Sequence, residues 1–426
     1  MRQKYSSYLT LASSAALAQG LLLAISPLIT RLYGPEDVGG FGVILGLGAL
    51  VGSVGTGRLE HAIPVARRGI DAIRIALLGA VLVALTSTLS IALISLVSAW
   101  GLVEDPDWQK FPLMAIPVIA SSLAFFQLVN ALLLRQHAYR SVGMNKIYQG
   151  GVTGLLQLLL GWAALGSSGL IWAQALGYLA GGWSGLHRSL FRWGRAIRRQ
   201  GLCLRDTFSR YRRFPLVLAP AALFNLASQH FPVLALGYIY GLYEAGLYAL
   251  VMRVCGAPLG LLGQAVSQVY ASEFRTFLGG RDELLAQKYV AMLARLLGLG
   301  VIVVGALVLV MNLWGTWLFG ARWANIGTVT SLLSMMLVMD FATTPVSMTL
   351  GYLGNGRTQL AWDVGRLVAV TCVVVAVRHL SLRFGQFLVL LAVVWSLSLL
   401  IHAWLTYRAC RVAGAAKSAL AGDRTA

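Results

Sequence analysis

The 426-residue chain is 58% hydrophobic and only 12% charged, with a mean hydropathy of +0.74 and a formal net charge of +19. Soluble domains carry about 25% charged residues, so this composition excludes a chain that folds mainly as a soluble domain. The basic residues alternate with apolar stretches, and the positive charge therefore indicates membrane topology and contact with anionic lipid rather than nucleic-acid binding.

The apolar residues fall into stretches long enough to cross about 30 Å of hydrocarbon as helices. About twelve are predicted, at roughly 8–30, 38–57, 73–100, 112–134, 147–165, 170–187, 214–240, 246–268, 289–312, 326–352, 360–378 and 384–407. The first stretch remains apolar as far as Ile29, beyond the short apolar region of a signal peptide. We expect an uncleaved helix there, with signal-peptide cleavage as the alternative.

The Lys and Arg residues indicate the orientation of the chain. With the N-terminus in the cytoplasm, about 26 of the 34 lie on the cytoplasmic side and about five on the outer side. This bias predicts an even number of passes, with both termini in the cytoplasm. Residues 188–213 then lie on the cytoplasmic side, where arginines interspersed with apolar residues predict an amphipathic helix on the membrane surface.

Two short loops share a pattern. Residues 33–41 read YGPEDVGGF and residues 240–248, which lie 207 positions further on, read YGLYEAGLY. Six predicted passes separate the two copies, so both face the same side of the membrane. The pattern predicts a parallel repeat, with an N-terminal six-helix bundle at 1–187, a basic linker at 188–213, and a C-terminal six-helix bundle with a short cytoplasmic tail at 214–426. A chance match between two glycine-rich turns is the alternative.

The first of these loops belongs to a longer stretch that resembles a known family. Residues 26–39 read SPLITRLYGPEDVG and residues 58–64 read RLEHAIP. They resemble the opening "spl.tRly.pedfG" and "lryE.Ai.lp" stretches of the Wzx-type polysaccharide and O-antigen flippases of the multidrug/oligosaccharidyl-lipid/polysaccharide (MOP) exporter superfamily. His61 departs from the pattern, because members often carry an apolar residue there. Weaker matches in the second half are Asn225, Tyr240–Tyr248, Pro258, Phe319–Trp323 and Trp362–Arg366.

The resemblance implies an all-α polytopic fold, with about twelve helices in two six-helix bundles around a central cavity. It implies flipping of an undecaprenyl-diphosphate-linked oligosaccharide, such as an O-antigen repeat unit of lipopolysaccharide, across a bacterial inner membrane by alternating access. It implies no enzyme activity and no cofactor except Na⁺ or H⁺ as a coupling ion. Membrane lipid is an expected partner, polysaccharide polymerase and chain-length proteins are further candidates, and nucleic acid is not expected.

A diphosphate needs fixed cations, and the planar guanidinium of arginine binds phosphate with two parallel hydrogen bonds. Charges inside membrane spans are costly and normally face a cavity. The candidate diphosphate ligands are Arg58, Arg253, Arg295 and Arg366. Pro258 frees the carbonyl of Val254, which predicts a kink beside Arg253. The alternative for Arg253 is an arginine that reaches to the outer interface.

The predicted span at 214–240 contains three prolines and a set of polar residues. Asn225 and Gln229 are four residues apart and share a helix face, and His230 follows them. We expect this face to contact sugars, with helix–helix hydrogen bonding as the alternative.

Three carboxylates are candidates for ion coupling. Asp340 is the deepest predicted charge, and Glu60 and Asp363 also lie near the presumed path. For Asp340 the alternative is a hydrogen bond to a neighbouring helix. For Asp363 it is a structural ion pair with Arg366, three residues further along the same helix.

Two other functions fit the composition. A cation-coupled exporter of drugs or small solutes would favour acidic and aromatic residues over arginines in its cavity. A membrane enzyme, such as a polymerase or acyltransferase, would need catalytic groups on a large outer loop, and the predicted outer loops are short. The sequence contains no nucleotide-binding loop of the Walker type, which argues against direct use of ATP.

Overall fold

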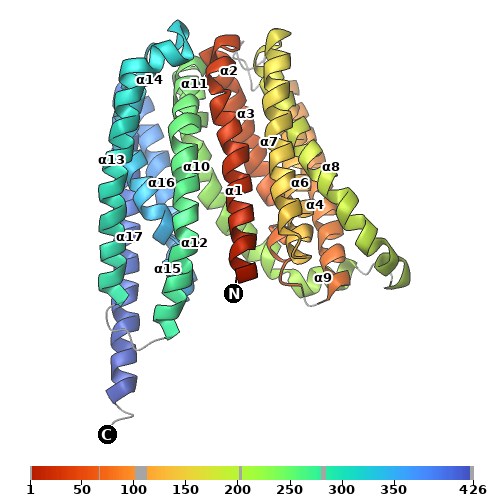
Figure 1. The fold of residues 1–426 in the computed structure, drawn as a ribbon. Helices are drawn as coiled ribbons and strands as arrows, with labels where there is room; N and C mark the ends of the chain where they lie inside the picture. Colours follow the sequence, from red (N-terminus) through yellow and green to blue (C-terminus); the bar gives the residue numbers. More distant parts are fainter. Residues whose placement is uncertain (1, 67, 101–112, 201–203, 280–284, 423–426) are drawn as a thin grey trace. The chain divides into compact units, whose positions relative to one another are not determined.

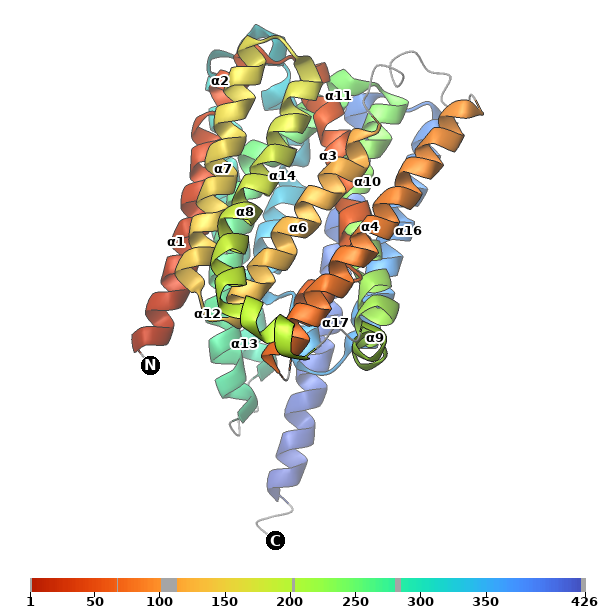
Figure 2. The same cartoon turned by 90° about the vertical axis from the view of Figure 1, so that its right-hand side faces the viewer.

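The computed structural model describes residues 2–66, 68–100, 113–200, 204–279 and 285–422, and these residues are mainly helical, with no strand among them. Their contacts divide the chain into two compact units, Met1–Ala249 and Leu250–Ala426. Within each unit long helices lie side by side, as Figures 1 and 2 show. The all-α class is therefore confirmed.

The first unit contains the helices of the N-terminal half and the two that follow the linker. They are α1 (Arg2–Ala24), α2 (Ser26–Leu32), α3 (Pro35–Gly55), η1 (Leu59–His61), α4 (Gly69–Ala99), α6 (Ala115–Arg135), α7 (Tyr139–Trp162), α8 (Gly166–Gln200), α9 (Leu204–Tyr211), η2 (Phe214–Leu218), α10 (Ala219–Ile239) and most of α11 (Leu242–Val251). Helix α10 packs along α3, which is why the contacts group it with this unit.

The second unit contains the remaining helices. They are η3 (Met252–Gly256), α12 (Ala257–Gly279), α13 (Leu285–Phe319), η4 (Ala321–Trp323), α14 (Ile326–Thr343), η5 (Thr344–Val346), α15 (Thr349–Tyr352), α16 (Gly356–Leu380) and α17 (Phe384–Gly422). In this unit α14 packs between α13 and α17, and α16 packs on α17.

In the part of the chain that the structure describes, ten helical stretches are long and apolar enough to cross a membrane. Two predicted spans are not among these ten, and they correspond to α7 and α8, of 24 and 35 residues. Both helices are long enough to span a bilayer, but several glycines and polar residues lower their hydropathy. Small residues such as these let helices approach closely, and α7 and α8 pack extensively on each other. The division into two six-helix bundles stays a prediction.

The predicted linker at 188–213 is largely helical. Helix α8 continues unbroken from its predicted span to Gln200, and α9 covers Leu204–Tyr211. On α9 Thr207 is buried, and Leu204 and Tyr211 pack on the hydrophobic cluster of η1, α4 and α6. These three residues recur at helical spacing, so one face of α9 is docked on the unit. The predicted outer loop at 101–111 lies outside the described residues.

The YGPED stretch forms a helix start. Gly34 caps α3, Pro35 occupies its first turn, and Oδ2 of Asp37 accepts a hydrogen bond of 3.0 Å from the Gly34 N–H. The other carboxylate oxygen of Asp37 accepts from the Ser167 N–H at 2.9 Å, which fastens the start of α3 to the start of α8. The motif therefore has a structural role at this end of the unit.

Tyr33 precedes this cap and is almost fully buried, and its hydroxyl donates to the Gln157 carbonyl of α7 at 2.8 Å. Burial, with the nearby carboxylate of Asp37, raises the pKa of Tyr33 to about 12. The phenol therefore remains a protonated donor at neutral pH, and the hydrogen bond to α7 persists.

Proline residues coincide with irregular turns in two places. Pro215 lies in the π-helical turn η2, and Pro258 follows the π-helical turn η3, which contains Arg253. A proline removes a backbone hydrogen bond, and a wider turn is one way in which a helix absorbs that loss. Such turns often mark functional positions. A π-helical turn thus lies where the sequence predicts a kink, beside Arg253.

The orientation gives a first testable prediction. Helix α9 and the α7–α8 turn lie at opposite ends of the first unit (Figure 2). In a background without cysteines, Ser209→Cys on α9 should resist a membrane-impermeant thiol reagent in intact cells and react after permeabilisation. Ser167→Cys at the start of α8 should react in intact cells. The reverse pattern would refute the predicted orientation.

Candidate functional site

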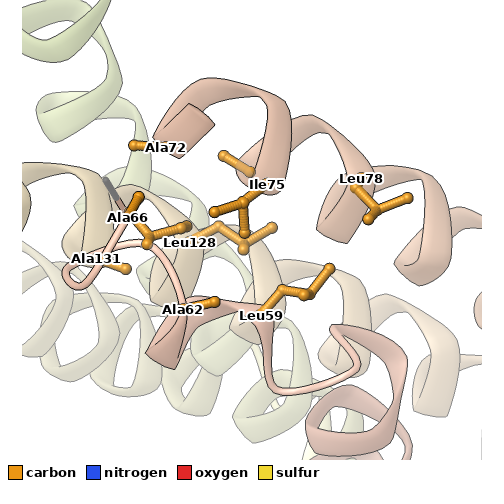
Figure 3. Packing of buried hydrophobic residues seen from close by; sticks show 10 residues of the cluster. Leu59, Ala62, Ala66, Ala72, Ile75, Leu78, Leu128 and Ala131 are labelled. Carbon is orange, nitrogen blue, oxygen red and sulfur yellow. The ribbon is translucent and has the colours of Figure 1, made fainter. Parts of the chain in front are cut away.

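The RLEHAIP stretch forms a loop that is anchored by apolar side chains. Leu59, Ala62 and Ile63 are fully buried, and they belong to a hydrophobic cluster with α4 and α6. Figure 3 shows how this cluster fills the space between η1 and those two helices. Burial of each large apolar side chain contributes about 1.5–3 kcal/mol. The loop is therefore held in a defined position, and its polar residues are presented from a fixed base.

The polar residues of this loop form a compact charge group. Nη1 of Arg58 lies 3.4 Å from Oε1 of Glu60, and the His61 ring nitrogen Nε2 lies 3.7 Å from the same oxygen. The side chain of Glu60 is only 8% exposed. Its second carboxylate oxygen, Oε2, makes no hydrogen bond to the described residues. A buried carboxylate with one free oxygen has capacity to bind a proton or a cation.

The backbone of Arg58 and the charges around His61 further define this charge group. Arg58 has a left-handed backbone with φ 55°, an uncommon conformation for a non-glycine residue. Loss of solvent lowers the pKa of His61 from its usual value, while the Glu60 carboxylate opposes that shift and the Arg58 guanidinium adds to it. Arg58, whose guanidinium is permanently charged, is therefore the main cation that balances Glu60.

A second charge group connects the linker to α4. Asp71 near the start of α4 lies 3.8 Å from Nη1 of Arg74 and 3.7 Å from Nη1 of Arg210 on α9. Arg210 is mostly exposed, so this bond to α9 contributes little free energy. It lies within the contact between α9 and α4.

The predicted polar face of α10 is present. The Gln229 amide donates to Oδ1 of Asn225 at 2.7 Å, and Gln229 is exposed. Gly46 of α3 packs against His230, because a Cβ there would lie 3.3 Å from the His230 Cβ. The three residues predicted to contact sugars thus follow one another along α10.

The second unit contains a polar network formed by α14, α16 and α17. Asp363 and Arg366 form the ion pair that their spacing predicts, with Nη2 of Arg366 lying 3.7 Å from Oδ1 of Asp363. The side chains of Arg366 and Asp363 are 6% and 8% exposed. A buried charge in a membrane span needs a partner, and this pair meets that need within one turn of α16.

Two indole rings complete the surroundings of Arg366. Its guanidinium carbon lies 4.5 Å from the centre of the Trp362 ring and 5.1 Å from the centre of the Trp395 ring. Aromatic faces stabilise a desolvated cation. Trp395 also donates from Nε1 to Oδ1 of Asp340 on α14 at 2.9 Å. Asp340 therefore makes the hydrogen bond to a neighbouring helix that was the alternative to a coupling role.

The network continues along α16 and α17. Gln359 joins the His402 ring at 3.0 Å and the Asp363 carboxylate at 3.4 Å, and Trp362 donates to the Ser398 carbonyl at 2.7 Å. The Trp362 and His402 rings lie 4.4 Å apart. Polar atoms on three helices are thereby connected, and hydrogen-bonded networks of this kind respond as a unit when one member changes charge.

The structure places the other two candidate arginines differently. Arg253 lies in η3 and is half-buried, whereas Arg295 is exposed on α13. Of the four arginines, Arg366 alone belongs to the network described above. Binding of substrate by any of them stays a prediction.

Sequence reasoning missed four members of the network, which are Gln359, Trp395, Ser398 and His402. A signal was available, because the last three recur at spacings of three and four residues on an otherwise apolar helix. One polar stripe predicts that a helix faces a polar partner, but it does not say which helix supplies that partner. The partners come from α14 and α16, and only the packing of the unit reveals them.

The ion pair in the network gives a second prediction. Asp363→Ala leaves the Arg366 charge without its carboxylate and should cost about 3 kcal/mol. The double variant Asp363→Leu/Arg366→Leu removes both charges, so its loss of unfolding free energy should be smaller. We expect the thermal denaturation midpoint in detergent to follow that order, with exposed Arg357→Ala as the control. Equal midpoints for Asp363→Ala and the parental protein would contradict the structural role.

Comparison with known proteins bears on the function of this arrangement. No protein-family model matches the chain. The succinoglycan biosynthesis transport protein ExoT of Rhizobium meliloti (strain 1021) is 22% identical over 404 residues, which cover 92% of this chain and 77% of that protein.

Solved structures show a fold similar over nearly the whole chain. An inward-facing multidrug-resistance MATE transporter of the MOP superfamily superposes with a TM-score of 0.69 at 16% identity, covering 94% of this chain and 95% of the other. A MOP-superfamily transporter from Pyrococcus furiosus superposes with a TM-score of 0.59 at 14% identity, covering 97% and 96%.

These proteins are transporters and not enzymes, in agreement with the argument from the short outer loops. The resemblance drawn from the opening motifs, the all-helical structure and the two comparisons give the same answer. The chain is a multi-pass membrane protein with the fold of the MOP-superfamily transporters.

Proposed function

We propose that this protein moves a polyprenyl-diphosphate-linked oligosaccharide from the cytoplasmic to the outer leaflet of a bacterial inner membrane by alternating access. The observation that supports the proposal best is the likeness to ExoT, which extends over 92% of the chain and whose name describes transport in succinoglycan biosynthesis. The opening motifs support the same class of substrate. An O-antigen unit or another surface polysaccharide unit fits the proposal equally.

This substrate requires a transport path with polar groups that bind its diphosphate and its sugars. Its lipid tail remains in hydrocarbon, while the diphosphate and sugars need polar partners on the way. Arg58 and Arg253 are the proposed diphosphate ligands at different stages, and Arg295 and Arg366 are further candidates. Arg58 is part of the anchored η1 loop and is about a quarter exposed, with 24% of its side-chain surface accessible. Arg253 lies in the π-helical turn η3, and such turns often occur at functional sites.

Sugars are bound by hydroxyl and amide partners. Asn225 and Gln229 present amide groups on α10, and the exposed Gln229 keeps donor and acceptor capacity beyond its bond to Asn225. His230 lies beside them against α3. We assign these residues to the proposed sugar-contacting face.

A drug or small-solute exporter is the second candidate, because several solved structures with this fold are MATE transporters, one of them in complex with MaL6. The two functions predict different consequences when the gene is removed from its host. Loss of a flippase should cause a lipid-linked oligosaccharide to accumulate in the cytoplasmic leaflet and surface polysaccharide to disappear. Loss of a drug exporter should instead raise sensitivity to toxic cations with both glycan pools unchanged.

Arg253 gives the third prediction. Arg253→Ala should lower export of the glycan at least about tenfold, which corresponds to about 1.4 kcal/mol, by loss of a charge-assisted hydrogen bond to phosphate. Arg253→Lys should restore it only in part, because lysine lacks the planar fork. Surface polysaccharide in a complemented deletion strain is the measurement, with exposed Arg357→Ala as the control. Full export by Arg253→Ala at normal protein abundance would refute the assignment.

Asp340 is the first candidate for ion coupling. Asp340 is half-buried on α14 and within electrostatic range of Arg366, with its Oδ1 bonded to Trp395. Taking up H⁺ or Na⁺ would neutralise the carboxylate and weaken its attraction to Arg366, and the network would carry that change to α16 and α17. Glu60 in the first unit and Asp363 in the network are further candidates for this role.

Asp340→Asn supplies the fourth prediction, because asparagine keeps the shape and the acceptor for Trp395 but cannot change charge. Vesicles with this variant should bind the lipid-linked oligosaccharide and lose the response to an imposed H⁺ or Na⁺ gradient. Arg357→Ala, at an exposed position outside the network, is the control and should keep the gradient response. Gradient-driven transport at the parental rate by Asp340→Asn would exclude coupling through this residue.

A further inference from the structure

The two copies of the internal repeat contact each other in the first unit. Gly39 of α3 packs on α11, where a Cβ added to it would overlap the carbonyl oxygen of Leu242 and lie 2.9 Å from the Gly246 nitrogen. Gly246 of α11 packs on α3 in return, where an added Cβ would overlap the carbonyl oxygen of Pro35 and lie 3.0 Å from its Cα. The two helix starts therefore meet backbone to backbone.

The residues in this contact are equivalent in the repeat. Leu242 is the repeat equivalent of Pro35, and Gly246 is the repeat equivalent of Gly39, because each pair lies 207 positions apart. Gly39 touches Leu242, and Gly246 touches Pro35, so the two contacts are equivalent. Reciprocal contact of this kind is what a two-fold axis produces between identical surfaces. The YG–G pattern is therefore a genuine internal repeat, and its local axis passes between α3 and α11.

The same relation continues one turn further along. A Cβ at Gly42 would lie 3.2 Å from the Cβ of Ala249, and these two positions are also 207 residues apart. A residue that faces its own equivalent lies on the axis itself. The three contacts between α3 and α11 are therefore arranged about one axis, and each of them includes a glycine.

We propose that this reciprocal glycine contact is the outer closure of the transport path, made when the starts of α3 and α11 meet and broken when the outer side opens. The inference rests on the proposed function. The contact lies at the end of the first unit that carries the α7–α8 turn, which the loop charges place outside. Glycines allow two backbones to touch without interlocking side chains, so separation exposes little apolar surface and costs little free energy.

A hinge is available next to the contact. The boundary between the two compact units falls between Ala249 and Leu250, directly after the last pair on the axis. The π-helical turn η3 begins two residues later, at Met252. Irregular turns are where helices bend, so the start of α11 can move without disturbing α12.

A disulfide across the axis tests the closure. Gly42→Cys with Ala249→Cys, in a background without the natural cysteines, brings two Cβ atoms to about the spacing that a disulfide requires. We expect the disulfide to form in membrane vesicles on mild oxidation, to block transport of the lipid-linked oligosaccharide, and to release the block on reduction. Gly150→Cys with Ala18→Cys is the control: their Cβ atoms lie 3.3 Å apart between α7 and α1. That disulfide should form and leave transport unchanged.

A second pair of variants tests the need for glycine. Gly246→Ala places a methyl group on the Pro35 carbonyl, so we expect it to lower the disulfide yield at positions 42 and 249 at least about fivefold, and to lower transport. Gly39→Ala should act in the same way. Gly260→Ala on α12, where an added Cβ meets nothing within 4 Å, is the matched control and should change neither readout.

The outcomes separate the closure from the proposed function. A disulfide that forms without blocking transport would show a permanent contact and overturn the closure, as would failure of the pair to cross-link while the Gly150/Ala18 pair does. A parental protein that moves no lipid-linked oligosaccharide would instead contradict the proposed function. In that case the disulfide yield, and its loss in Gly246→Ala but not in Gly260→Ala, still decides whether glycine is required for the contact.

Discussion

Hydrocarbon offers no hydrogen bonds, so every polar group that enters the membrane must find its partner within the protein. That constraint explains why the described chain is built from helices, and it explains the form of the network in the second unit. Arg366 is held by Asp363 and by two indole faces, and Trp395 gives its N–H to Asp340. A charge placed there without these partners would cost several kcal/mol. Because these groups contact one another, a change of charge at one member alters the interactions of the others.

The close approach of helices is the second condition, and glycine provides it. In lipid there is little hydrophobic force between helices, so packing and backbone contact hold them together. The glycines at the start of α3 and α11 allow a contact that a single methyl group would prevent. A contact without interlocking side chains is specific in position and weak in free energy, which suits a surface that must separate and meet again.

The opening motifs have two kinds of role. In the RLEHAIP loop the apolar residues anchor η1, and the charged residues are held on that base. In the YGPED stretch Asp37 and Tyr33 fasten α3 to α8 and α7, and Gly39 gives the contact on the axis. Residues that carry a family resemblance therefore need not touch the substrate. Several of them make the framework in which Arg58 and Glu60 are placed.

The sequence by itself determined the membrane class, the positions of nearly all the helices and the Asp363–Arg366 pair. These features depend on hydropathy over about 20 residues or on spacings within one helix turn, and both are local properties of the chain. Tertiary structure alone decided which helices supply the partners. Trp395 reaches Asp340 across 55 positions, and Gly39 meets its equivalent across 207. Such contacts depend on how helices pack in three dimensions, and helical periodicity specifies a polar or small face without specifying its neighbour.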